Sequence, residues 1–188
     1  MALNFASMIG RAVLPRRRPA FWRDERGATA VEMGLLALPF FSIIGAILET
    51  SVVFLSGQML HSAAQDASRL IRTGQLQSST IEDFRSDMCD RLYGLFDCSK
   101  LHIEVQTLTS FSAANVTPPV NFACSTKEEC EEWTRNEAYT PGIQSSIMIV
   151  QVYYKWPTLL NIGGMTLATL ASGERVLGAA TVFRNEPF

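Results

Sequence analysis

The chain lacks the sequence motifs that mark several common classes of enzyme. It contains no Gly-x-Ser-x-Gly nucleophile motif, no glycine-rich phosphate-binding loop and no arrangement typical of a Ser-His-Asp triad. Its two histidines, His61 and His102, do not lie beside its cysteines, and no Cys-x-x-Cys pair occurs. The sequence therefore predicts a protein that is not an enzyme, with no catalytic residues, no metal site, no cofactor and no small-molecule substrate.

Charged residues are scarce over one long segment near the N-terminus. From residue 33 to residue 65 the only charged side chain is that of Glu49. A helix needs about 20 mostly apolar residues to cross a bilayer, so this segment is long enough to span a membrane and continue beyond it. Six arginines and only two acidic residues lie between residues 11 and 26, and this excess of positive charge predicts a cytoplasmic N-terminal end. We therefore expect a single membrane pass, with the rest of the chain on the outer side.

Two ordinary explanations compete for this segment. A secretory signal peptide has an apolar core of roughly 7–15 residues followed by a small-residue cleavage site, but here the run is longer and the small residues Ala28-Thr29-Ala30 precede it. An uncleaved anchor helix accounts for the arginines and the apolar run, but it leaves Glu32 unexplained.

Glu32 stands five positions after Gly27, where the arginine-rich segment gives way to the apolar one. A charge inside a membrane helix costs about 2.5–3.5 kcal/mol on insertion scales, and less near the end of the helix. A small residue followed at this distance by a carboxylate is the processing signature of type IV pilin-like subunits. In such subunits the carboxylate pairs with the amine that cleavage exposes. This pairing would offset the free-energy cost of placing the Glu32 charge in a membrane helix.

Both ends of the chain resemble one family. The segment Asp24-Glu25-Arg26-Gly27-Ala28-Thr29-Ala30-Val31-Glu32-Met33-Gly34-Leu35-Leu36-Ala37-Leu38-Pro39 is similar to the start of TadE-like proteins. These are pseudopilins, or minor pilins, of bacterial tight-adherence (Tad/Flp) pilus systems. The ending Val182-Phe183-Arg184-Asn185-Glu186-Pro187-Phe188 also resembles that family. Met33 departs from it, because an aromatic residue usually follows the glutamate.

The resemblance implies a role for each residue of the motif. A prepilin peptidase of the inner membrane would cut between Gly27 and Ala28, and Glu32 would become the fifth mature residue and pair with the N-terminal amine, commonly that of a neighbouring subunit. The implied partners are the prepilin peptidase, other Tad minor pilins, the major Flp pilin and the inner-membrane assembly platform. The implied function is pilus biogenesis and, through it, surface adhesion. The alternative is an uncleaved, inner-membrane-anchored periplasmic scaffold of a secretion or pilus machine.

Loss of the leader would make the chain acidic. Without residues 1–27 it keeps 10 of its 16 lysines and arginines and 16 of its 18 acidic residues, which gives a net charge of −6. Nucleic-acid binding needs a basic face, so we expect no nucleic-acid partner.

The predicted fold class is α+β and pilin-like, with a basic cytoplasmic leader at 1–27, a long helix at 28–73 and a periplasmic globular domain at 74–188. Arg69, Arg72 and Gly74 have the positions of helix-ending residues. Thr80 can cap a second helix, with an apolar stripe from Ile81 to Phe96.

Three segments have the pattern of strands in an antiparallel sheet. Residues 101–107 alternate between apolar and polar side chains, which predicts a half-buried strand. Residues 147–154 are rich in β-branched and aromatic residues and read as a central strand, and residues 175–184 form the third. The connection at 109–143 is long enough to predict an element of its own, which we expect as a short helix from Lys127 to Asn136.

All four cysteines follow the apolar segment, and disulfides form readily outside the cytoplasm. Four cysteines allow three pairings. We favour Cys89 with Cys98 and Cys124 with Cys130, because each pair closes a short local loop.

Overall fold

The computed structural model describes residues 27–162 and 164–187, and at Ile162 it describes the backbone only. The predicted leader lies outside these residues, apart from Gly27. The chain divides into two compact units, Met1–Phe41 and Ser42–Phe188. The first unit contributes the beginning of helix α1 (Ala28–Arg72), and the second contains the rest of α1 and all the other elements.

The long helix ends where the sequence predicts. The N–H of Gln75 donates to the carbonyl of Leu70 and the N–H of Gly74 donates to that of Ile71, which is the Schellman arrangement of a helix C-terminus. Gly74 has a φ of 79°, a left-handed conformation that glycine adopts without a side-chain clash. The helix runs through Pro39.

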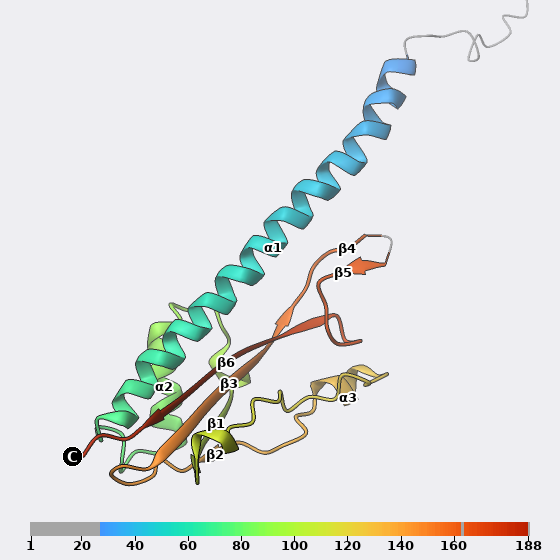
Figure 1. Ribbon diagram of the computed structural model, residues 1–188. Coiled ribbons are helices and arrows are strands. Elements are labelled where there is room, and N and C mark those ends of the chain that lie inside the picture. Colours follow the sequence, from blue (N-terminus) through green and yellow to red (C-terminus); the bar gives the residue numbers. More distant parts are fainter. Residues whose placement is uncertain (1–26, 163, 188) are drawn as a thin grey trace, which may run out of the picture. The chain divides into compact units, whose positions relative to one another are not determined.

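Beyond residue 52, α1 buries one stripe of mostly small side chains. The buried residues recur every three or four positions, as on one face of a helix: Val53, Ser56, Leu60, Ala63, Ala64, Ala67, Ser68 and Ile71. Together with helix α2 (Ile81–Arg91) they cover one face of the sheet (Figure 1).

Helix α2 begins with the predicted cap. The Thr80 hydroxyl accepts from the N–H of Asp83 and the Asp83 carboxylate accepts from the N–H of Thr80, so both donors are satisfied by a capping box. The helix buries Phe84 and Met88 in the main core. Its last turn carries Cys89, which is bonded to Cys98.

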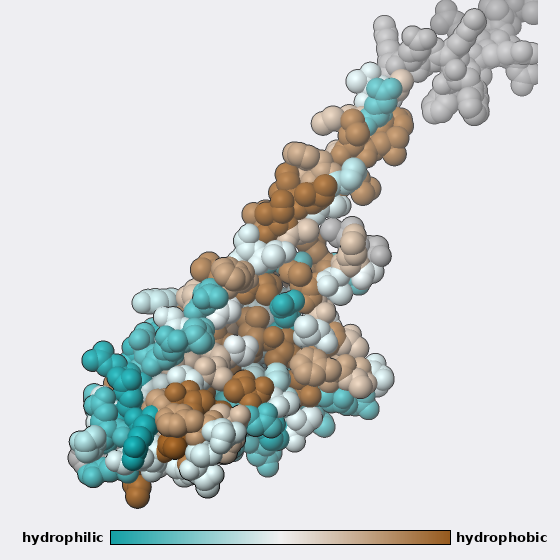
Figure 2. Space-filling view, viewed as in Figure 1, coloured by the Kyte–Doolittle hydropathy of each residue, from teal (hydrophilic) through white to brown (hydrophobic). Residues whose placement is uncertain are grey.

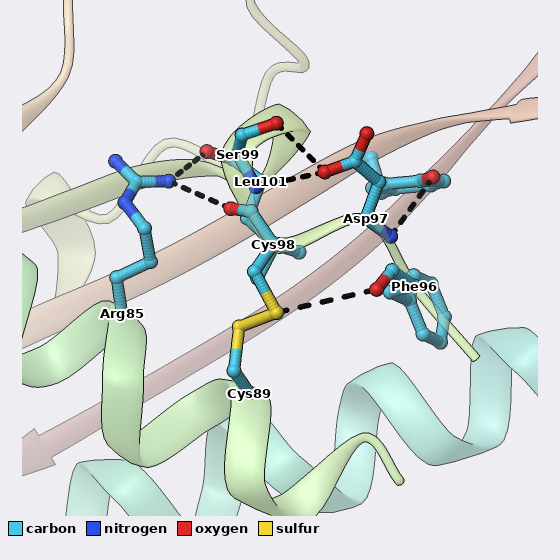
Figure 3. Close-up of a disulfide and its surroundings, with 8 residues drawn as sticks. Arg85, Cys89, Phe96, Asp97, Cys98, Ser99 and Leu101 are labelled. Carbon is cyan, nitrogen blue, oxygen red and sulfur yellow. Dashed lines mark hydrogen bonds between the residues drawn. A yellow bond between two sulfur atoms is a disulfide. The ribbon is translucent and has the colours of Figure 1, made fainter. Parts of the chain in front are cut away.

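The Cys89–Cys98 disulfide ties α2 to the short 3-10 helix η3 (Cys98–Lys100) that precedes the sheet. Arg85 reinforces this junction, since its guanidinium donates to the carbonyls of Cys98 and Leu101 (Figure 3). The pair is the one that the short loop predicts.

The main sheet has four strands in the order β2-β1-β3-β6. Strand β3 (Ile147–Pro157) is central and pairs antiparallel with both β1 (His102–Leu108) and β6 (Glu174–Arg184). The α+β prediction with about three antiparallel strands is confirmed. The two-residue strand β2 (Ala138–Tyr139), parallel to β1, adds an edge that makes the sheet mixed.

The prediction of a half-buried β1 is wrong for the first half of the strand. His102 and Glu104, expected on the solvent side, are buried as deeply as their apolar neighbours. The reason is that part of the long connection between β1 and β3 covers this second face. In β3 the alternate residues Ile149, Gln151 and Tyr153 are buried there too.

The long connection contains the 3-10 helix η4 (Phe111–Ala113), the helix α3 (Lys127–Glu131) and β2. The Cys124–Cys130 disulfide closes a loop across the start of α3. The helix expected to reach Asn136 stops five residues earlier. The Lys155 ammonium donates to the carbonyls of Glu131 and Glu132, and Glu132 has an extended backbone conformation, so the chain leaves the helix there.

The segment of the chain that connects β3 to β6 forms a second, smaller sheet. Strands β4 (Asn161–Ile162) and β5 (Met165–Thr166) form a two-stranded antiparallel hairpin. No sequence pattern predicted this element.

Candidate assembly site on the apolar helix

The predicted cleavage site coincides with the beginning of α1. Gly27 is the residue before the helix, and Ala28 is its first residue. Both are exposed, and among the described residues no atom would come within 4 Å of a Cβ placed on Gly27. The bond between them therefore lies at the first residue of α1.

Glu32 lies one helical turn after Ala28. Side chains four residues apart share a face of an α-helix, with a rise of about 6 Å between them. Glu32 is exposed, and within residues 27–162 and 164–187 it forms no ion pair. A new amine on Ala28 would thus place opposite charges one turn apart on each chain, available to each other or to a neighbouring chain.

The surroundings of Glu32 on the helix are apolar and exposed. The structure contains one helix, among the residues it describes, that is long and apolar enough to cross a membrane, and it is α1. The most apolar 18-residue window of α1 has no buried residue. Figure 2 shows hydrophobic residues along this helix, and they include Val31, Leu35, Leu36, Phe40, Phe41, Ile43, Ile47, Leu48 and Phe54, all more than half exposed.

Glu49 is the second carboxylate of the apolar run, and its partner lies within the chain. Its Oε1 accepts hydrogen bonds from the backbone N–H groups of Leu159 and Leu160. Sequence reasoning did not anticipate this contact, because 110 residues separate Glu49 from Leu159.

A cluster of polar side chains on the second face of the sheet was also missed. The carboxylate of Glu104 accepts two hydrogen bonds from Arg135, both of 3.2 Å, and lies 3.1 Å from Nε2 of His102. The His102 ring stacks on Trp133, with 4.4 Å between centroids, and the Lys155 ammonium lies 4.0 Å above the same ring. His102 and Glu104 of β1 and Lys155 of β3 are buried and hydrogen-bonded. This cluster is therefore a stabilising layer between the sheet and the long connection.

Burial sets the charge of this polar layer. It lowers the pKa of His102, although the hydrogen bond to Glu104 acts in the opposite direction. Burial also lowers the pKa of Lys155, against the attraction of Glu174 and Glu131. In the sequence His102 and Glu104 look like ordinary polar residues of an alternating strand, so nothing local marked the layer.

The described residues hold no group of three or more side chains suited to a metal ion. The four cysteines are paired, Cys89 with Cys98 and Cys124 with Cys130, as the short loops predicted. Their sulfur atoms are therefore committed to covalent bonds and do not act as thiolate ligands.

One comparison with known proteins gives a match, and it covers most of the N-terminal helix. The family model described as TadE-like protein matches residues 27–69. The matched segment begins at Gly27 and includes Ala28, Glu32 and nearly all of α1, so the resemblance seen in the sequence is confirmed for this part of the chain. No curated protein and no solved structure matches the chain.

Proposed function

With the TadE-like match over residues 27–69 as the premise, we propose that this chain is a minor pilin-like component of a Tad/Flp pilus system. In this proposal a prepilin peptidase cuts it between Gly27 and Ala28, and it acts in pilus assembly and thereby in surface adhesion. The observation that carries the proposal is the coincidence of three boundaries at one place. The family match, the exposed apolar helix and the small residue of the cleavage motif all begin at residues 27–28.

Cleavage would supply a positive charge close to the Glu32 carboxylate, which forms no ion pair with the residues that the structure describes. The uncut chain has an amide at residue 28, whereas the cut chain has an ammonium group there. Opposite charges attract far more strongly in low-dielectric surroundings than in water, and a buried charge without a partner is costly. A subunit entering an assembly therefore gains from pairing the Glu32 carboxylate with the Ala28 amine of a neighbour, and this pairing would set the axial position of the two helices.

The disulfides support export of the domain that follows α1. Both close within the second compact unit, at Cys89–Cys98 and Cys124–Cys130. Disulfides persist in oxidising compartments and are rare in the cytoplasm. Together with the basic leader at 1–27, which favours a cytoplasmic N-terminal end, this supports a periplasmic location for the proposed domain at 74–188 and an inner-membrane location for α1.

The proposed partners follow from the same premise. The prepilin peptidase acts on Gly27, the platform of the inner membrane receives the cut subunit, and other minor pilins or the major Flp pilin contact its helix. TadE-like proteins are structural pilus components, and the energy for extracting the subunit from the membrane would come from the cytoplasmic ATPase of the system.

The proposal is tested by changing Glu32 to Gln in the full chain expressed in its own cells. The change removes the charge and keeps the size, so we expect a loss of surface pili while both disulfides still form. Glu128→Gln, the same change at an exposed position of α3, is the matched control and should leave piliation unchanged.

Normal piliation in the Glu32→Gln cells would contradict the charge pairing. An uncut chain in those same cells, with a cut control, would instead mean that Glu32 acts in recognition by the peptidase. A chain that is never cut in any strain would favour the uncleaved periplasmic scaffold.

A further inference from the structure

The connection between β3 and β6 packs against the long helix near Glu49. We use the name 158–167 loop for residues 158–162 and 164–167, which contain β4 and β5 (Figure 1). Glu49 accepts hydrogen bonds from the N–H groups of Leu159 and Leu160. Leu160 also approaches so closely that its Cδ1 would lie 3.1 Å from a Cβ placed on Gly45. The loop is therefore seated on one segment of α1.

That segment lies at a defined distance along the helix. Glu49 is 21 residues after Ala28, which corresponds to about 32 Å at 1.5 Å per residue. The hydrocarbon core of a bilayer is about 30 Å thick. A span that enters the membrane near Ala28 therefore leaves it near Glu49, and the segment from Gly45 to Glu49 lies in its outermost turns.

The composition of the loop suits this depth. No charged residue occurs from Pro157 to Gly173, within an exported part that is otherwise acidic. Leu159 is 88% exposed and Met165 is 76% exposed. Between the loop and the helix lies a cavity of about 250 Å³, lined mainly by apolar side chains such as Ile43, Ala46 and Leu167. Exposed apolar surface of this kind is typical of a contact with a membrane or a partner.

Hydrogen bonds inside the loop point in the same direction. Irregular backbone is tolerated at membrane depth only where its polar groups are satisfied without water. Besides the two bonds to Glu49, Asn161 Oδ1 accepts from the N–H of Gly164 and Thr166 Oγ1 accepts from that of Ala168. Glu49 in turn obtains two donors for a carboxylate that the apolar run would otherwise leave unpaired.

We propose that the 158–167 loop rests in the outer interface of the membrane that α1 crosses, with Leu159 and Met165 among the lipid chains. The partner of this surface is the lipid bilayer itself. The proposal rests on the membrane-spanning part of the proposed function. It adds a second membrane contact, which would fix the orientation of the domain and its distance from the membrane surface.

The test uses tryptophan reporters in the full chain, reconstituted in phosphatidylcholine vesicles that contain lipids brominated on their acyl chains. Bromine quenches tryptophan emission on contact, and the native tryptophans are accounted for by subtracting the signal of the unaltered chain. Leu159→Trp reports on the loop, and Ile43→Trp reports on the span.

Phe111→Trp is the matched control for an exposed apolar position far from the span. Phe111 follows Leu108, which pairs through Ile147 with Arg184 at the end of β6. Glu186, two residues after Arg184, forms an ion pair with Arg72, the last residue of α1. This end of the sheet thus lies beside the helix end opposite to Ala28.

We expect Ile43→Trp and Leu159→Trp to lose emission to the brominated lipid and Phe111→Trp to keep it. If Leu159→Trp behaves like Phe111→Trp while Ile43→Trp is quenched, the loop proposal is overturned and the span stands. If Ile43→Trp is also unquenched, the span itself fails and the loop proposal fails with it. If the Leu159→Trp side chain is not quenched by the brominated lipid and chemical cross-linking shows dimers in the same vesicles, the loop contacts a second copy of the chain. That result would overturn the lipid proposal.

A pair of glycine variants tests whether the helix positions the loop. Gly45→Leu introduces a side chain where Leu160 now lies, whereas Gly34→Leu meets no described atom within 4 Å of its Cβ. In the Leu159→Trp chain, Gly45→Leu should alter the quenching and Gly34→Leu should not. Equal quenching in both would contradict the seating of the loop on α1.

Discussion

The two parts of α1, residues 28–52 and residues 53–72, belong to one helix but bury their side chains differently. None of residues 28–52 is buried, and their exposed side chains are mainly large, as with Leu35, Phe41 and Ile47. In the second part eight residues are buried, and three of them are alanines with at most 2% exposure.

The difference shows how the helix meets two kinds of partner. Small residues let the second part approach the sheet closely, and its opposite face carries polar residues such as Gln65 and Asp66, as expected of a helix on a globular domain. The first part exposes mainly large apolar side chains, a pattern typical of a helix that contacts lipid or other helices. The predictions below test whether the two parts really have separate roles.

The largest expected effect comes from truncating one leucine in each part. Leu60 is fully buried against the core and Leu48 is 61% exposed. Leu60→Ala should lower the free energy of unfolding by about 2–5 kcal/mol, because a cavity replaces core contacts. Leu48→Ala should change it by less than about 0.5 kcal/mol. Urea unfolding of the full chain in detergent, followed by tryptophan fluorescence, measures both, and equal losses would contradict the division of the helix.

Removing the Cys89–Cys98 disulfide tests whether the domain can be weakened without the span. Cys89→Ala with Cys98→Ala should lower the free energy of unfolding of the domain by about 2–3 kcal/mol, since the crosslink no longer restricts the unfolded chain. The chain should nevertheless remain in the membrane after alkaline carbonate extraction. Release of the chain into the soluble fraction would show that the apolar helix needs the folded domain to stay inserted.

Helix caps give a smaller effect and a direct contrast between α2 and α1. Thr80→Ala breaks the capping box and should cost about 1 kcal/mol of unfolding free energy. Thr29→Ala, in the first turn of α1, should have no measurable effect on the domain, because α1 gains its stability elsewhere. A similar loss in the two variants would indicate that the start of α1 contributes to the fold of the domain.

The smallest expected effect is a pH dependence that belongs to the domain alone. The pKa of His102 is lowered by burial, so folding favours its neutral form. Below the unfolded-state value of 6.5 the unfolded chain binds more protons than the folded one, and stability falls as the pH falls through the folded pKa. Because the Glu104 contact opposes the effect of burial, the change should be modest. It should disappear in His102→Gln, and an equal slope in that variant would assign the pH dependence to another group.

Local signals in the sequence predicted much of the fold. The stop at Gly74, the cap at Thr80 and the three long strands each depend on residues close together in the chain, and so do the two disulfide loops. The candidate site at Gly27, Ala28 and Glu32 was readable for the same reason, because its motif occupies six consecutive positions.

The features that were missed depend on contacts between distant residues. Arg135 reaches Glu104 across 31 positions, and Leu159 reaches Glu49 across 110. The alternation in residues 101–107 predicted that one face of the strand is exposed to solvent. It carried no information about the connection between β1 and β3 that covers that face. The early end of α3 has the same origin, because Lys155 of β3 binds its last carbonyls.

The central claim is that this chain is a processed pilin-like subunit, and its N-terminal sequence tests that claim most directly. The protein would be isolated from membranes of cells with and without the prepilin peptidase and sequenced from its N-terminus. We predict a chain that begins at Ala28 only in cells that contain the peptidase. A chain that begins at Met1 in both strains would contradict the claim and leave Glu32 in an uncut membrane anchor.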